Sequence, residues 1–334
     1  KNLKTLTMSY NKISDISALA ELSNLKTLDL SYTQYGYDGS KAFSARYYKI
    51  GKLKDISILS ELKSLESLNL SHNKIEDISA LGKLTQLNEL HLDNNLKITD
   101  ITPLAELKSL TVFTFSYNNV KNLNALAGLT NLKNLDLSYS QYNSKEDYSA
   151  GALKDISMLS GIKNLETLNL SNNKISDISA LSELTSLKSL NLLNNKISNI
   201  SVLAGLTNLT DLSLGGGYDN ASQISDISAL SGLTNLTSLQ LSYMDKLSDI
   251  SPLSGLTNLT SLDLWWMDKL SDISAIASLT NLTKLSIRGD SISDISTVAN
   301  LTNLTDLVIG GSNNCGISDI SAIASLTNLT KLSI

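Results

Sequence analysis

The sequence repeats itself every 22 residues or so, and this period is what most limits the folds open to the chain. Its first unit reads Asn2-Leu3-Lys4-Thr5-Leu6-Thr7-Met8-Ser9-Tyr10-Asn11, which has the form L-x-x-L-x-L-x-x-N. The first leucine of each unit falls at Leu3, Leu25, Leu65, Leu87, Leu110, Leu132, Leu165, Leu187, Leu209, Leu236, Leu259, Leu282, Leu304 and Leu329. Thirteen complete units and the start of a fourteenth therefore cover all 334 residues, and such a chain grows along one axis.

Each unit predicts one strand followed by one short helical turn. The L-x-L segment places two leucines on the same side of a strand, because strand side chains alternate. One unit cannot bury these leucines alone, so stacked units should form a parallel sheet on a concave face. The recurrent D-I-S-x-L segment, as at Asp15, carries a helix-capping residue before an apolar stretch. Pro103 and Pro252 suit an early helical position, so we expect 3-10 turns or short helices on the convex face.

These motifs resemble the internalin-type bacterial leucine-rich repeat, most closely at Leu206-Thr-Asn-Leu-Thr-Asp-Leu212 and in residues 197–206. The resemblance extends over the whole chain. It implies an α/β repeat solenoid in the form of a leucine-rich-repeat horseshoe or arc. It also implies surface display and binding of another protein, often a host receptor, without pointing to a particular partner. Internalins usually add a helical cap and an immunoglobulin-like module, and neither is recognisable here. We therefore expect a single domain over residues 1–334 with uncapped ends, as a fragment of a longer protein.

Composition argues against several other classes of protein. The net charge is −5, and no basic stripe is present, so the footprint of a nucleic-acid-binding protein is missing. No apolar run approaches the roughly 18 residues of a membrane helix, so we expect no direct membrane insertion in this segment. The single cysteine, Cys315, excludes a disulfide framework and a cysteine-based metal site.

Four units are longer than the rest, and each carries its extra residues after the strand. The inserted loops are expected at about residues 33–52, 140–152, 215–223 and 310–316. Because all four leave the repeat at the same point, they should project from one edge of the solenoid.

The tyrosines and tryptophans give the best functional signal. Five of the twelve tyrosines precede the turn residue, both tryptophans lie at the same place, and the other seven tyrosines lie in the inserted loops. None is expected at a core position. Stacking between adjacent repeats could account for them, and so could a recognition surface, because Tyr and Trp dominate binding hot spots. The predicted partner contacts are Tyr10, Tyr32, Tyr35, Tyr47, Tyr48, Tyr117, Tyr139, Tyr142, Tyr243, Trp265 and Trp266.

No residue pattern predicts catalysis or a cofactor. The chain lacks a nucleophile elbow and a phosphate-binding loop, and Gly215-Gly216-Gly217 fits a turn. His91 should face outward near Glu89 and Asp93, which is too few ligands for a metal site. The Asp column of the D-I-S segments could bind calcium through oxygen ligands, but its regular spacing favours capping.

These observations favour a non-enzymatic binding module, secreted or displayed on a bacterial surface. It would recognise a protein or glycan through its concave face and its loop-bearing edge, in the manner of an adhesin. Two alternatives stay open, namely a segment of a self-assembling surface filament or stalk and an intracellular protein-interaction scaffold.

Overall fold

The computed structural model describes residues 2–32, 34–35, 48–49, 51–120, 122–139, 153–217, 220–311 and 316–334. The chain divides into two compact units. Unit 1 comprises Lys1–Leu153 with Met158–Leu165, and unit 2 comprises Lys154–Ser157 with Glu166–Ile334. Both units are built from the same repeat, in which a short strand is followed by a 3-10 helix.

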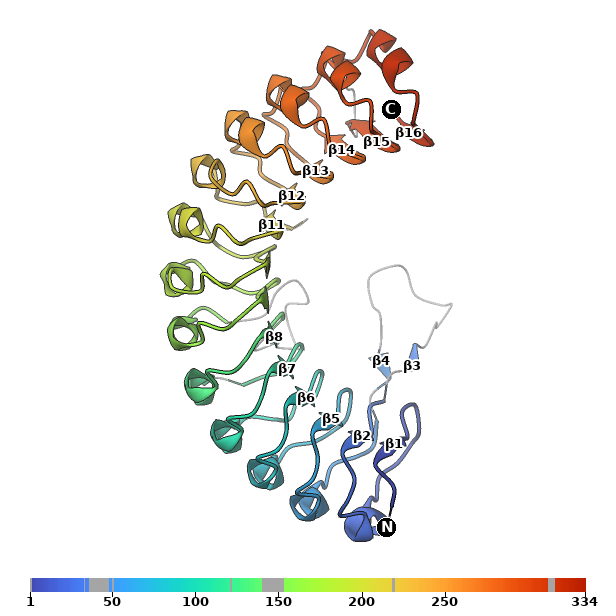
Figure 1. Ribbon diagram of the computed structural model, residues 1–334, viewed down its shortest axis with the longest axis vertical. Coiled ribbons are helices and arrows are strands. Elements are labelled where there is room, and N and C mark those ends of the chain that lie inside the picture. The colour runs from blue at the N-terminus through green and yellow to red at the C-terminus, as the bar shows by residue number, and fades with distance from the viewer. Residues whose placement is uncertain are drawn as a thin grey trace. The chain divides into compact units, whose positions relative to one another are not determined.

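Unit 1 contains six parallel sheet strands in chain order (Figure 1). They are β1 (Thr5–Thr7), β2 (Thr27–Asp29), β5 (Ser67–Asn69), β6 (Glu89–His91), β7 (Val112–Thr114) and β8 (Asn134–Asp136). The 3-10 helices are η1 (Ser17–Glu21), η2 (Ser57–Glu61), η3 (Ser79–Lys83), η4 (Thr102–Glu106) and η5 (Asn124–Gly128), and η6 (Ser157–Gly161) begins at the boundary. Strands β3 (Gln34–Tyr35) and β4 (Tyr48–Lys49) form a separate antiparallel pair.

Unit 2 continues the pattern with eight parallel strands. They are β9 (Thr167–Asn169), β10 (Ser189–Asn191), β11 (Asp211–Gly215), β12 (Ser238–Ser242), β13 (Ser261–Trp265), β14 (Lys284–Arg288), β15 (Asp306–Gly310) and β16 (Lys331–Ser333). The helices are η7 (Ser179–Leu181), η8 (Ser201–Gly205), η9 (Ser228–Leu230), η10 (Ser251–Gly255), η11 (Ser274–Ser278), η12 (Ser296–Asn300) and η13 (Ser321–Ser325). Strands β11 to β15 have five residues, whereas β9 and β10 have three.

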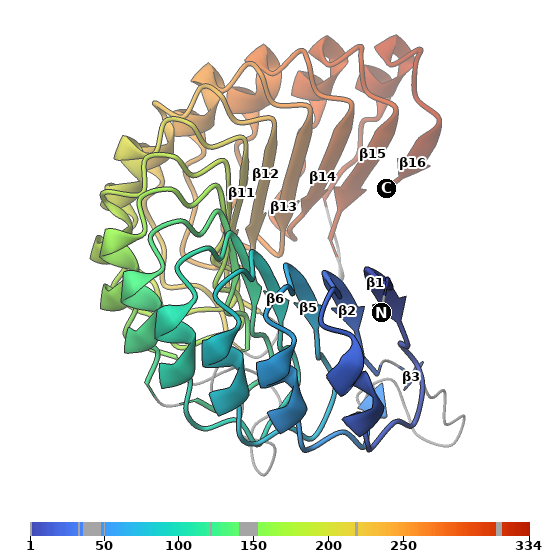
Figure 2. The same cartoon turned by 60° about the horizontal axis from the view of Figure 1, so that its bottom comes forward.

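In each unit the sheet and the 3-10 helices lie on opposite faces (Figures 1 and 2). The leucines of the repeat form the buried core. The register stacks equivalent leucines, so that Leu68 pairs with Leu90 and Leu190 with Leu212. These side chains are almost completely buried. The predicted fold class, a leucine-rich-repeat solenoid, is confirmed. Among the described residues, no helix combines the length and the apolar character needed to cross a membrane.

The asparagine that closes the motif links consecutive repeats. The Nδ2 of Asn95 donates to the backbone oxygens of Leu70 in the preceding repeat, at 3.0 Å, and of Leu92 in its own, at 3.1 Å. Its Oδ1 accepts the amide of Ile75 at 3.3 Å. Asn195 makes the equivalent bonds in unit 2. The buried asparagines therefore satisfy backbone groups that water cannot reach.

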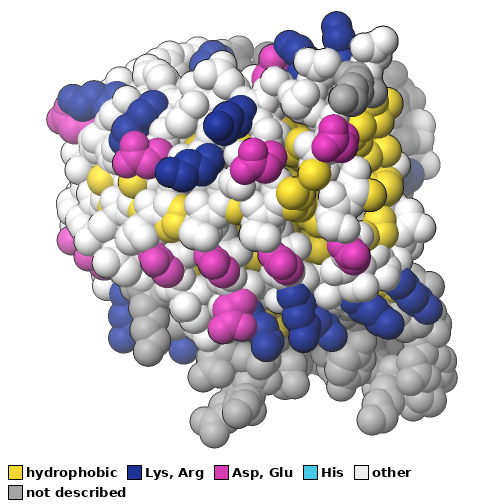
Figure 3. Space-filling view, turned by 90° about the horizontal axis from the view of Figure 1, so that it is seen from below, with side chains coloured by type: hydrophobic (Ala, Val, Ile, Leu, Met, Phe, Trp, Pro, Cys, Tyr) yellow, Lys and Arg dark blue, Asp and Glu magenta, His cyan; other side chains and the backbone are white. Residues whose placement is uncertain are grey.

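The aspartate of the D-I-S segment caps the 3-10 helix, as predicted, but from one residue before the N-cap position. In η1 the N-cap residue is Ile16, and the Oδ1 of Asp15 accepts the backbone amide of Ser17 at 2.9 Å. The same bond, at 2.8–2.9 Å, is made by Asp55, Asp77, Asp155, Asp177, Asp226, Asp249, Asp272, Asp294 and Asp319. Figure 3 shows acidic side chains in a row on one face of the molecule.

These caps should make the solenoid sensitive to acid. The backbone amide that each carboxylate accepts holds the pKa of each of these ten aspartates below its ordinary value. A group whose pKa is lowered by folding stabilises the protein above its unfolded pKa of about 3.9. That stabilisation is lost as the pH falls through the folded pKa. The melting temperature should therefore drop steeply below about pH 4.

A variant with Asp177, Asp226, Asp249 and Asp272 replaced by Asn tests this prediction. Asn caps helices about as well as Asp and does not titrate, so the variant should match the wild type at pH 7. Between pH 5 and pH 2 the melting temperature of the variant should fall less than that of the wild type. Equal losses in both proteins would show that the caps do not cause the acid sensitivity.

Candidate binding surface

Aromatic residues occupy a strained backbone position at the end of several strands. The residue before the turn adopts a positive φ in nine repeats, at Tyr10, His72, Asn94, Tyr117, Tyr139, Asn172, Asn194, Tyr243 and Trp266. Asn is the residue that tolerates this left-handed conformation best, and it occurs there three times. A bulky side chain costs on the order of 1–3 kcal/mol in that region, and such strain clusters at functional sites. The aromatic choice therefore opposes stability at this position.

The aromatic rings of neighbouring repeats stack, and the described residues of each unit include such a pair. In unit 1 the rings of Tyr117 and Tyr139 lie 4.2 Å apart, centroid to centroid, at an interplanar angle of 14°. In unit 2 the rings of Tyr243 and Trp266 lie 5.8 Å apart, also at 14°. All four side chains are partly exposed. Stacking therefore leaves part of each pair open to solvent, and the prediction that these residues contact a partner stays a prediction.

Tyr32 and Tyr10 differ sharply in exposure although they belong to consecutive repeats. Tyr10 is 63% exposed. Tyr32 is only 4% exposed, so the expectation that no tyrosine lies in the core is wrong for this residue. Its backbone also lacks the positive φ of the other pre-turn aromatics. A buried ring has no surface to offer a partner, and we exclude Tyr32 from the candidate surface.

The structure describes the predicted loop tyrosines only in part. Tyr35 and Tyr48 pair across the antiparallel strands β3 and β4, but their side chains lie outside the described part. Tyr47 and Tyr142 also lie outside the described residues. These four predicted contacts stay predictions.

Trp265 forms its own small cluster at the end of β13. Its side chain is 37% exposed, and its Nε1 donates to the Oγ of Ser286 at 2.6 Å. The guanidinium carbon of Arg288 lies 5.1 Å from the ring centroid, within the range of a cation–π contact. Trp265 is thus fixed by two neighbours on β14 while more than a third of its surface stays open. We call these exposed aromatic residues the aromatic surface of their unit: Tyr10, Tyr117 and Tyr139 in unit 1, and Tyr243, Trp265 and Trp266 in unit 2.

Asp263, two residues before Trp265, was missed as a site residue by sequence reasoning. Equivalent Asp and Asn side chains elsewhere accept the backbone amide two residues further on, as Asp29 does from Ser31 at 2.8 Å. Asp263 makes no such bond, and its Oδ1 is buried without a hydrogen-bond partner among the described residues. Burial raises the pKa of Asp263 to about 6, although the positive charge of Arg288 lowers it. The signal in the sequence is the change from Asp-Leu-Ser-Tyr to Asp-Leu-Trp-Trp.

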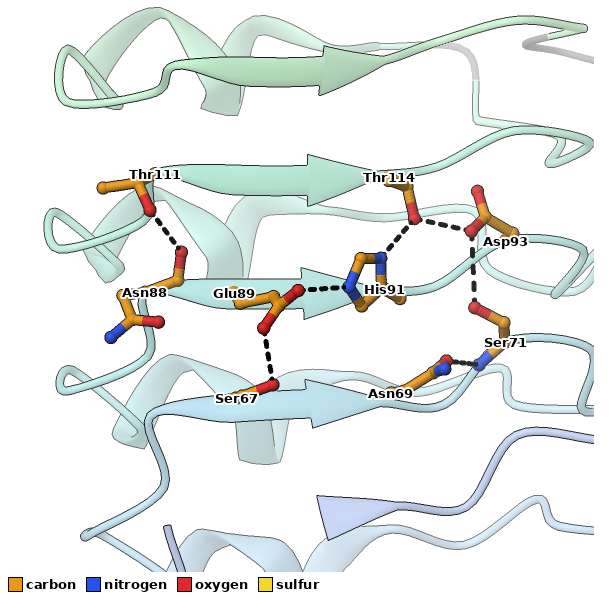
Figure 4. A network of polar contacts seen from close by, with 9 residues as sticks. All are labelled: Ser67, Asn69, Ser71, Asn88, Glu89, His91, Asp93, Thr111 and Thr114. Atoms are coloured by element: carbon orange, nitrogen blue, oxygen red, sulfur yellow. Dashed lines mark hydrogen bonds and ion pairs between the residues drawn. The ribbon is translucent and has the colours of Figure 1, made fainter. Parts of the chain in front are cut away.

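A polar network on the sheet of unit 1 accounts for His91 (Figure 4). Its Nε2 lies 3.0 Å from Glu89 Oε1, and its Nδ1 lies 2.9 Å from Thr114 Oγ1. The Thr114 hydroxyl donates to Asp93 Oδ2 at 2.5 Å. Hydrogen bonds from His91 and Ser67 hold the pKa of Glu89 below its usual range. Both ring nitrogens of His91 are therefore engaged, and the network links neighbouring repeats instead of presenting free ligands.

Metal ligands do not cluster among the described residues. The described residues contain no group of three or more His, Cys, Asp or Glu side chains placed to hold one. The Asp column considered for calcium uses its Oδ1 atoms on backbone amides, as Asp177 does with Ser179.

Replacing Tyr243 with Asn separates the two explanations of the aromatic surface. Asn relieves the left-handed strain, worth on the order of 1–3 kcal/mol, but loses the stack with Trp266, worth about 0.5–1.5 kcal/mol. We therefore expect the free energy of unfolding, measured by urea denaturation, to change by less than about 1 kcal/mol. Asn172→Ala at the same position is the control for loss of a residue that suits this backbone. A loss above about 2 kcal/mol for Tyr243→Asn would mean that the ring acts mainly as a structural stack.

Comparison with known proteins identifies the same leucine-rich repeat that the fold shows. A family model described as "Leucine Rich repeats (2 copies)" matches residues 1–35, 63–106, 147–183 and 234–278. A search of curated proteins found no match. The structure therefore defines a leucine-rich-repeat solenoid, a class whose members serve as interaction modules.

Two solved structures from Listeria monocytogenes narrow the class. An internalin, inlF, is 29% identical, and the similarity covers all of this chain and 87% of inlF with a TM-score of 0.69. Internalin C2 is 33% identical over 57% of this chain and 76% of its own, with a TM-score of 0.50. A leucine-rich-repeat protein from Leptospira interrogans, at 22% identity and a TM-score of 0.76, shares the fold over all of this chain and 78% of its own. The chain belongs to the internalin-like leucine-rich-repeat proteins.

Proposed function

We propose that this chain is a non-enzymatic, secreted or surface-displayed module that binds a protein through its aromatic surface. The observation that carries the proposal is the placing of Tyr117, Tyr139, Tyr243 and Trp266 in left-handed backbone positions that favour Asn. A residue choice that works against stability needs another benefit, and contact with a partner supplies one. Similarity to the internalins supports surface display and an adhesin-like role.

The stacked pairs suit protein recognition for a physical reason. Tyr and Trp offer a large contact area with few rotatable bonds, so little conformational entropy is lost when they bind. Stacking fixes the rings further, as for Tyr117 and Tyr139 at 4.2 Å. A partner therefore meets rings that are already ordered, which reduces the entropic cost of association.

Saturable binding of the fluorescently labelled chain to cultured epithelial cells, measured by flow cytometry, tests the proposal. Wild type should bind and be displaced by an excess of unlabelled chain. The double variant Tyr243→Asn with Trp266→Asn should bind at least roughly tenfold more weakly while keeping its melting curve, because hot-spot aromatics typically contribute 2 kcal/mol or more. His72→Asn, which makes the same kind of change at the equivalent backbone position in unit 1, is the matched control.

Two outcomes would contradict the proposal. Binding that is absent or cannot be saturated would remove the adhesin-like role. Equal binding by the wild type and the double variant would remove the aromatic surface from it. Light scattering over a concentration series should accompany the test, because ordered polymers would favour the alternative of a self-assembling surface filament.

A further inference from the structure

The Oδ1 of Asp263 receives no hydrogen bond from the strands around it. In β2, β5, β8, β9 and β10 the residue at this position is Asp or Asn, and its Oδ1 accepts the amide two residues on. That bond takes the amide out of the sheet ladder, and those strands have three residues. In β13 the strand runs on to Trp265, which pairs with Ser242 and Arg288 in the sheet. The donor that serves the other repeats is therefore not bonded to Asp263.

The nitrogen-bearing side chains next to Asp263 make their described contacts with other groups. The indole Nε1 of Trp265 donates to Ser286, and Arg288 lies against the Trp265 ring. Among the described residues, no Lys or Arg nitrogen forms an ion pair with Asp263 within 4.0 Å. On the other side, Gln240 of β12 pairs with Asp263 in register, but its Nε2 donates to Ser242. The carboxylate is half-buried, with one oxygen shielded and unbonded.

We propose that Asp263 anchors a basic side chain, Arg or Lys, of the protein partner, with Trp265 beside it as an aromatic contact for the same group. The inference rests on the proposed function and adds the chemistry of the partner. A guanidinium supplies the donors that this carboxylate lacks, and rotation about the Cβ–Cγ bond can bring either oxygen to it. The chain's own Arg288 lies against this ring at 5.1 Å, and the partner's group would contact the 37% of Trp265 that stays exposed. A site that is only partly solvated strengthens such a pair relative to one in water.

The negative charge that attracts a cation here is that of Asp263 itself, and the neighbouring residues on β12, β13 and β14 do not add to it. On β14, Arg288 and Lys284 are positive, and on β13 and β12 the flanking Ser261 and Gln240 are neutral. Burial raises the pKa of Asp263 to about 6 against the lowering effect of Arg288, so protonation of this carboxylate near pH 6 should remove the attraction. Binding of a basic group should therefore weaken as the pH falls from 7.5 to 5.0.

A tetra-arginine peptide with blocked ends is the probe. The chain contains two tryptophans, Trp265 and Trp266, so intrinsic tryptophan fluorescence reports on this place directly. We expect saturable quenching at pH 7.5, with the affinity falling about tenfold by pH 5.0. Asp263→Asn should weaken binding at least roughly tenfold at pH 7.5 and make it independent of pH. Asp29→Asn, which changes the net charge equally at the same repeat position, should stay within about twofold of wild type.

Folding of the variant is checked separately. Because Oδ1 of Asp263 is buried and unbonded, Asp263→Asn should melt at or above the wild-type temperature at pH 7.5. Absence of saturable binding, wild-type affinity in Asp263→Asn, or an equal loss in Asp29→Asn would each overturn the inference. If cell binding still depends on Tyr243 and Trp266 in that case, the proposed function stands and only the basic partner group is wrong. If cell binding is absent while the peptide binds through Asp263, the proposed function fails and this site remains.

Discussion

Replacing Asn95 with Ala is expected to lower the free energy of unfolding by at least roughly 3 kcal/mol. Asn95 is fully buried, and its side chain bonds the carbonyls of Leu70 and Leu92 and the amide of Ile75. Ala leaves these groups without partners, and each buried unsatisfied group costs about 1–3 kcal/mol. Because the bonds join two repeats, the loss should appear at their interface, which carries much of the stability of a solenoid.

Urea denaturation followed by circular dichroism measures the size of this loss, and amide hydrogen exchange locates it. Exchange should speed up first at Ile75 and in β5 and β6, which flank the lost bonds. Asn88→Ala is the matched control, since Asn88 is exposed and the change should stay within about 0.5 kcal/mol. A loss below about 1 kcal/mol for Asn95→Ala would mean that water takes over the hydrogen bonds of the asparagine side chain.

The repeat alone was sufficient to predict the sheet, the 3-10 helices and the core. A fixed period means that each leucine meets its counterpart one repeat away, as Leu68 meets Leu90, so burial follows directly from the alignment of units. The Asp caps could be predicted for the same reason, because Asp15 and its equivalents need only a local backbone amide two residues away. Interactions that are local or strictly repeated are thus readable from the sequence.

The structure differs from the sequence-based predictions where the environment of a residue depends on neighbouring repeats and not on its own repeat. Tyr10 and Tyr32 occupy the same place in the repeat, yet Tyr10 is exposed and Tyr32 is buried, and only Tyr10 has a positive φ. The left-handed φ of Tyr243 could not be predicted from Tyr, which avoids that conformation, although the Asn at equivalent positions hints at it. Aligning the repeats therefore indicates a backbone conformation that the residue type alone does not.

Asp263 shows the same limit at the candidate site. Its identity matches Asp29 and Asp136, which cap their strands, and nothing in the single residue predicts a different role. The difference arises because β13 continues for two more residues through Leu264 and Trp265. At the turn of this repeat, moreover, a buried Met267 stands where Asn95 and Asn195 stand in theirs. The strand length, and with it the unsatisfied carboxylate, is therefore a property of several neighbours together.

Phe113 provides the second large stability effect, because it fills a position that leucine occupies in both neighbouring strands. Its ring is fully buried, lies 5.5 Å from that of Phe115 and pairs in register with Leu90 and Leu135. Phe113→Ala should cost about 3–5 kcal/mol in urea denaturation, since it loses apolar burial and leaves a cavity that the stacked leucines cannot close.

Phe113→Leu is the decisive companion variant, because it restores the residue that the repeat itself uses. Leucine stands at the paired positions of β6 and β8, so it should be accepted here at a cost of about 1.5 kcal/mol or less. If the leucine variant is as unstable as the alanine variant, the two phenylalanines form a specific aromatic core and the repeats are not interchangeable at this point. If it is nearly as stable as the wild type, the stability of unit 1 depends on filling the repeat volume and not on the identity of the ring.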